Sequence, residues 1–115
     1  MRLFIPVLAV VATLAACGGG GGAEEGTKVF KSMGALQCGS PGLSLAALQA
    51  QLAAANVQVR SAACGTDGRP VAAVCGAPDT RIGIFEIAPA QAGLAATAGF
   101  TLLSTLPAAK TVSCT

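Results

Sequence analysis

Three side-chain types that often carry chemistry are missing, because the 115 residues include no histidine, no tryptophan and no tyrosine. Without histidine the chain has no Ser-His-Asp or Cys-His catalytic arrangement and cannot complete a zinc ligand set of that kind, so we expect no metal and no cofactor. Phe30, Phe85 and Phe100 are too few to form an evident platform for stacking sugar rings or bases. These absences favour a protein that is not an enzyme.

Charged side chains are also scarce, at 10% of the chain. The lysines and arginines from Lys28 onward are scattered and nearly balanced by acids, which argues against a nucleic-acid partner. Asp67 and Asp79 lie in predicted turns, where aspartate usually bonds to the backbone and does not serve as half of an acid and base pair. Glu86 lies in a predicted strand, where we expect a cross-strand pair with Arg60. The remaining carboxylates, Glu24 and Glu25, precede the predicted domain.

The longest hydrophobic run is at the N-terminus. Met1 and Arg2 form a short basic start, and residues 3–16 are nearly all apolar and end in small side chains. This run is shorter than the roughly 20 residues that a membrane-spanning helix needs. Residues 1–16 are therefore predicted to be a secretory signal peptide, with a retained signal anchor as the alternative.

The signal ends in Leu14-Ala15-Ala16-Cys17, which resembles the lipobox of bacterial lipoproteins. In that family a branched apolar residue and two small residues precede the cysteine that is lipidated. The resemblance implies cleavage before Cys17 and attachment of diacylglycerol to its sulfur, usually with a further acyl chain on the new N-terminus. About two acyl chains suffice for stable membrane anchoring. A cysteine that stands by chance in an ordinary cleavage region is the alternative.

The residues after Cys17 are predicted to form a tether. Five glycines, residues 18–22, cannot bury apolar area and lose much backbone entropy on ordering. We therefore interpret residues 17–27 as the lipidated cysteine and a flexible tether, and residues 28–115 as one globular domain. In the lipoprotein family an aspartate directly after the cysteine typically retains the protein in the inner membrane. Gly18 stands there, so the resemblance implies the outer membrane, on its periplasmic face.

The other four cysteines are Cys38, Cys64, Cys75 and Cys114. An even number in a short exported chain predicts two structural disulfides, and no pair has the C-x-x-C spacing of a redox or metal site. Three pairings are open from sequence. We favour Cys64 with Cys75, closing a turn-rich loop, and Cys38 with Cys114, tying the start of the domain to its end.

The domain alternates between strand and helix patterns. Strands are predicted over residues 28–33, from Val57 and Val59 onward, over 71–74 after the Asp67-Gly68 turn, over 81–87 and over 101–106. Ser44 should cap a helix that ends near Asn56, and a second helix should run from Pro89 to a Gly99 cap. Residues 81–87 are apolar on both faces, so this strand should be central.

This order predicts an α+β fold, a small two-layer sandwich of ferredoxin-like type, β-α-β-β(β)-α-β. Its antiparallel sheet would carry two helices on one face and be stabilised by two disulfides. An open second face would present apolar side chains of residues 81–87, and a sizeable exposed patch there would mark a surface for a partner or for self-association.

Two classes of function follow. The favoured one is a membrane-anchored envelope lipoprotein whose domain is a non-catalytic protein-interaction or structural module, with an envelope protein or a second copy as partner. The alternative is a small periplasmic enzyme with an unrecognised carboxylate site. A pocket in which Glu86, Asp67 and Arg60 converge would favour the enzyme.

Overall fold

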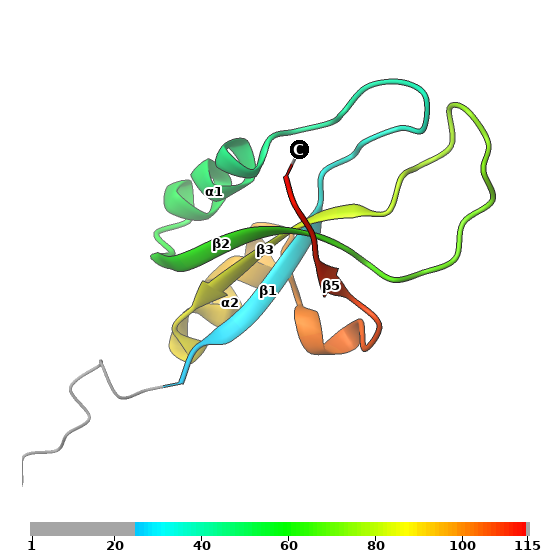
Figure 1. Cartoon of the computed structure of the whole chain (residues 1–115). Coiled ribbons are helices and arrows are strands. Elements are labelled where there is room, and N and C mark those ends of the chain that lie inside the picture. The colour runs from blue at the N-terminus through cyan, green and yellow to red at the C-terminus, as the bar shows by residue number, and fades with distance from the viewer. Residues whose placement is uncertain (1–24, 115) are drawn as a thin grey trace, which may run out of the picture.

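The structure is a computed structural model, and it describes residues 25–114 (Figure 1). The predicted signal peptide, Cys17 and the tether up to Glu24 lie outside the described residues. The elements in chain order are β1 (Thr27–Ser32), α1 (Leu45–Ala54), β2 (Val59–Thr66), β3 (Arg81–Ile87), the short 3-10 helix η2 (Pro89–Gln91), α2 (Ala92–Thr97), β4 (Thr101–Leu102), the 3-10 helix η3 (Leu103–Thr105) and β5 (Lys110–Thr111).

The strands form one antiparallel sheet in the order β4-β1-β3-β2-β5. The central position of β3 confirms the prediction from its two apolar faces. Leu48 of α1 and Ala95 of α2 belong to the same buried cluster as Val29 and Phe85, so both helices cover one face of the sheet. The α+β class and the antiparallel sheet with helices on one face are therefore as predicted.

Local sequence signals set the bounds of helix α1. The Ser44 side chain accepts a hydrogen bond from the Ala47 N–H at 3.0 Å, as an N-cap does. Leu48 and Leu52, four residues apart, are fully buried against the sheet. Asn56 adopts a left-handed conformation with φ of 64° and ends the helix. The predicted start and end of this helix are confirmed.

The second helical segment is also fixed by its ends. Pro89 begins a 3-10 turn that continues into α2, and Gly99 follows with φ of 94°. Phe100 then turns inward, where its ring lies edge-on to Phe85 with 5.7 Å between the ring centroids. Lys31 covers the Phe100 ring, with its Nζ 5.2 Å from the ring centroid. The Gly99 cap and the inward contact of Phe100 place α2 over β1.

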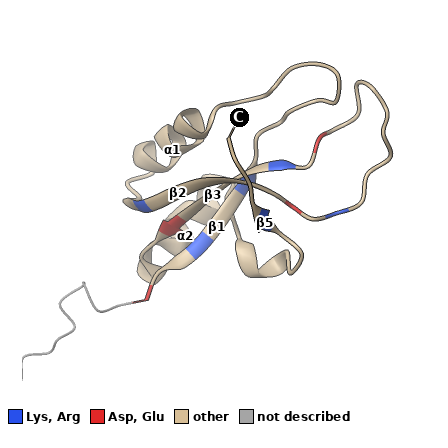
Figure 2. Cartoon of the chain, viewed as in Figure 1, with Lys and Arg blue, Asp and Glu red and all other residues tan. Residues whose placement is uncertain are grey.

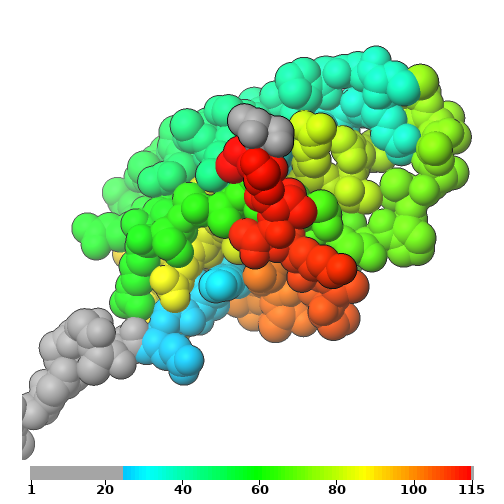
Figure 3. Space-filling view, in the orientation of Figure 1, coloured from blue at the N-terminus to red at the C-terminus, as the bar shows by residue number. Residues whose placement is uncertain are grey.

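The second face of the sheet is covered by the C-terminal segment, contrary to the expected open face. Ile82 and Ile84 of β3 are buried with Leu106, and the side chains of Leu103 and Ala109 pack against them. Figure 3 shows this C-terminal part of the chain lying across the molecule. Ile82 and Ile84, the apolar residues of β3 on this face, therefore belong to a second, smaller core and not to an exposed patch.

Two predicted strands differ from the structure. Residues 71–74 form no strand. They were expected to return beside β2 after the turn, but both edges of β2 are already paired, one with β3 and the other with β5. Gly68, with φ of 73°, packs so closely on Ala108 that an added Cβ would collide with it. The strand predicted over residues 101–106 is limited to β4 because the chain turns into η3, which brings Leu106 onto the second face. Strand β5 was not predicted from the sequence.

Candidate functional site

Two long loops lie side by side at one end of the sheet and form what we call the double loop, residues 34–43 and 67–80. The first follows β1, and the second connects β2 to β3. A disulfide between Cys38 and Cys75 joins them, with 5.0 Å between the Cα atoms, and Leu36 and Pro78 form an isolated β-bridge. The N-terminal chain enters β1 at the opposite end of this strand (Figure 1). The double loop thus lies at the end of β1 away from Thr27.

Gln37 holds the two loops together through its side-chain amide. Its Nε2 donates to the Ala72 carbonyl at 3.0 Å and to the Pro78 carbonyl at 3.3 Å, while its Oε1 accepts from the Val74 N–H at 3.0 Å. The Gln37 backbone N–H also donates to the Ala77 carbonyl at 2.9 Å. The Gln37 side chain therefore supplies residues 72–74 with hydrogen bonds of the kind that a neighbouring strand would supply. Gln37 was not predicted from the sequence, because a single glutamine in a loop carries no signal of a distant partner.

The double loop concentrates exposed apolar side chains. Val71 and Val74 are each 53% exposed. Among the described residues, the double loop contributes four of the seven large hydrophobic side chains that are exposed: Leu36, Leu43, Val71 and Val74. These residues lie on two loops that are joined by a disulfide, and exposed apolar surface that gathers in one region favours an interaction site. The double loop is therefore the candidate functional site.

The disulfides join the four predicted cysteines, but in a different pairing from the one favoured. Cys38 bonds to Cys75 and Cys64 bonds to Cys114, so the pairs Cys64 with Cys75 and Cys38 with Cys114 are wrong. The loop after β2 does not fold back on its strand but leaves to meet the other loop. The C-terminal chain instead runs beside β2, where the Val112 N–H donates to the Cys64 carbonyl at 2.9 Å.

The two disulfides should differ in their ease of reduction. Cys38 and Cys75 are both exposed, whereas the other bond joins the exposed Cys114 to Cys64, which is only 7% exposed and belongs to the core. Because a reducing thiol attacks a sulfur atom that it can reach, and both residues of the Cys38–Cys75 bond are exposed against one of the other bond, we expect dithiothreitol to open the Cys38–Cys75 bond first. Differential alkylation followed by peptide mass spectrometry measures the order. Opening of both bonds at one rate would contradict it.

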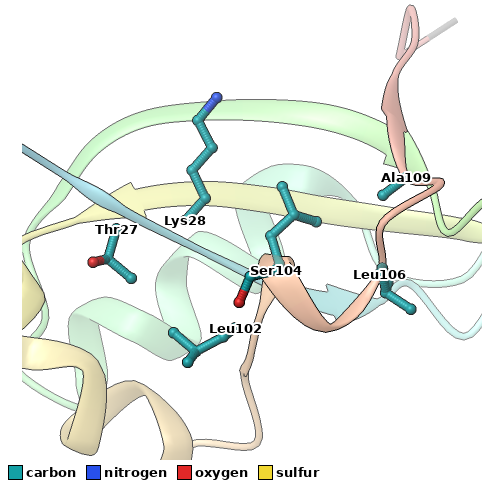
Figure 4. Close-up of a pocket in the computed structure, with 7 residues that line it drawn as sticks. Thr27, Lys28, Leu102, Ser104, Leu106 and Ala109 are labelled. Atoms are coloured by element: carbon teal, nitrogen blue, oxygen red, sulfur yellow. The ribbon is translucent and has the colours of Figure 1, made fainter.

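A groove lies on the second face between the sheet and the C-terminal segment, with a volume of about 520 Å³ (Figure 4). It is lined by Thr27, Lys28, Leu102, Leu103, Ser104, Leu106 and Ala109. An adjoining pocket of about 230 Å³ shares Lys28, Leu103 and Ala109 with it and contains Glu86 and Lys110. The polar groups of this pocket are thus two lysines and one carboxylate, together with the hydroxyls of Ser61 and Thr111.

Glu86 does not meet the partners that we expected. The strand register places Ser61 and Lys28 opposite it, because a bulge between Val59 and Ser61 shifts the pairing. The Ser61 hydroxyl donates to the Glu86 carboxylate at 3.5 Å. The predicted cross-strand pair with Arg60 is therefore wrong in register.

The two turn carboxylates bond to their own backbone, as predicted. The Asp67 carboxylate accepts from the Arg69 N–H at 2.9 Å, and that of Asp79 accepts from the Thr80 N–H at 2.6 Å. Asp79 also forms an ion pair with Arg81 at 3.4 Å. Asp67 and Arg60 do not line the pocket that holds Glu86, so the three groups do not converge.

Within residues 25–114, no group of three or more acidic or cysteine side chains is placed to hold a metal ion. None of the helices in this described part is long and apolar enough to cross a membrane. Comparisons with protein-family models, with curated proteins and with solved structures found no match for this chain.

Proposed function

We propose that this protein is a lipid-anchored protein of the bacterial envelope whose domain binds another protein chain through the double loop. The observation that carries this proposal is the exposed apolar surface of Val71, Val74, Leu36 and Leu43, held in place by the Cys38–Cys75 bond and by Gln37. The role is that of a non-catalytic interaction module on the periplasmic face of the outer membrane.

The cross-links within the double loop support binding. A loop that is already ordered loses less conformational entropy when a partner docks, so more of the contact energy appears as affinity. The cross-links also resist collapse of the apolar side chains onto the domain itself. Two disulfides in so small a domain are in addition typical of an exported protein in an oxidising compartment.

The direction of the chain supports the anchor. An acylated Cys17 would attach upstream of Thr27, at the end of β1 that lies away from the double loop. We also infer that β1-α1-β2-β3-α2-β4 is a ferredoxin-like unit to which β5 is added at one edge, an inference supported by the neighbours β4-β1-β3-β2 in the strand order.

Substitution of the exposed valines tests the proposal. In the full-length, affinity-tagged chain in intact cells, Val71→Ser together with Val74→Ser should lower the yield of chemically cross-linked complexes about tenfold or more, because anchor residues at interfaces often cost over 1 kcal/mol each when replaced. Leu94→Ser is the matched control, since Leu94 is similarly exposed but lies on α2. Equal yields from both variants would remove the double loop as the binding surface.

A further inference from the structure

The segment from Pro70 to Val74 has one bonded and one open edge. The Ala72 carbonyl and the Val74 N–H are bonded to Gln37. Within residues 25–114, the backbone N–H and carbonyl groups of Val71 and Ala73 have no hydrogen-bond partner. In an extended chain successive residues direct these groups to opposite sides, so those of Val71 and Ala73 face away from Gln37.

The open edge is short, but it carries no charged side chain that would oppose pairing with another chain. Residues 70–78 contain no charged side chain, and Figure 2 shows this part of the loop without blue or red. Pro70 would block pairing if its missing N–H lay on the open side. Pro70 lies two residues before Ala72, and residues two apart in an extended chain direct their backbone groups to the same side, so Pro70 belongs to the edge that faces Gln37. An apolar, uncharged and unpaired edge of this kind is a site for addition of a strand.

We propose that the occupant of this edge is the same segment of a second copy of the chain, paired antiparallel about a two-fold axis at Ala72. This inference rests on the proposed function, since it names the partner of the double loop. Val71 of each copy then pairs with Ala73 of the other, which satisfies all four groups on each copy. Pro70 of each copy lies opposite Val74 of the other, a position that needs no hydrogen bond across the interface.

Charge and membrane anchoring support a second copy as the occupant. The register places Arg69 of each copy opposite Cys75 of the other, so no like charges face one another across the two-fold axis. Two copies anchored in one membrane would also share their orientation and meet at a high effective concentration.

A single introduced cysteine tests the two-fold register. In a non-hydrogen-bonded antiparallel pair the two Cα atoms are about 4.5 Å apart, which is within the range that a disulfide spans. In the full-length chain in native membranes, Ala72→Cys should therefore give a disulfide-linked dimer for most of the protein under mild oxidation, seen on a non-reducing gel. Ala90→Cys, at an exposed alanine of η2, should remain monomeric. Peptide mapping should find the bond between the two introduced thiols.

A second substitution tests the hydrogen bonds. Val71→Pro removes an N–H that has no partner inside the described domain, so the thermal unfolding midpoint should not change, while cross-linking through Ala72→Cys should fall to the level of Ala90→Cys. If Val71→Pro does not fold, Ala73→Pro makes the same test.

Self-pairing would be overturned if the Ala72→Cys variant formed no more disulfide-linked dimer than the Ala90→Cys variant. It would also be overturned if the Ala72→Cys variant became cross-linked to a different protein. Neither result contradicts the proposed function. That proposal fails only if the variant with Val71→Ser and Val74→Ser gives an unchanged yield of cross-linked complexes. A dimer that persists in both proline variants would overturn the hydrogen-bonded register.

Discussion

A Cys17→Ser variant should carry no fatty-acid label after metabolic labelling, whereas the unmodified sequence should carry label and sediment with membranes. The physical reason is that the lipobox resemblance makes the Cys17 sulfur the attachment atom, and serine lacks the thiol. The domain should fold unchanged, because its own four cysteines pair with one another and leave no disulfide for Cys17 to form.

Cys38→Ser is the matched control for the label. This variant also loses one cysteine, but it should keep the full amount of fatty acid, since Cys38 is bonded to Cys75 in the double loop. Membrane sedimentation alone is a weaker measurement, because an uncleaved apolar segment over residues 3–16 would also hold the variant in the membrane. A chain of unmodified sequence without label would contradict the lipid anchor.

Phe85→Ala should cost about 3–5 kcal/mol of unfolding free energy, the range for removal of a buried aromatic ring. Phe85 is completely buried at the centre of β3 and packs between the two helices and the Phe100 ring. Domains of this size have total stabilities of roughly 5–15 kcal/mol, so this loss is a large share of the total. Urea unfolding, followed by far-ultraviolet circular dichroism, measures it.

The Phe30→Ala variant makes the same change of side chain on the other face of the sheet, so its loss of unfolding free energy can be compared with that of Phe85→Ala. Phe30 lies on the second face of the sheet, where it is half-buried beside Ile82, Ile84 and Leu106. Its loss should cost about 1–2 kcal/mol, because less apolar surface returns to water. Equal losses for the two variants would show that the face under the helices is not the principal core.

Local chemistry within a few residues determined part of this protein from its sequence alone. Ser44 and Asn56 set the ends of α1, since a cap and a left-handed residue act on the backbone next to them. The two apolar faces of β3 fixed its central position, because a strand buried on both sides has no polar face to give to water. The even number of cysteines in the domain predicted two disulfides, and all four cysteines are bonded.

Only the tertiary structure decided the partners of these elements. Cysteine spacing could not show that the loop after β2 leaves its strand to meet Cys38, or that the C-terminal chain returns beside Cys64. The bulge after Val59 moved Ser61 opposite Glu86, because a shift of one residue changes which side chains face each other. The contact of Gln37 with residues 72–74 spans 35 residues and more of chain, and it depends on where the whole sheet places the two loops.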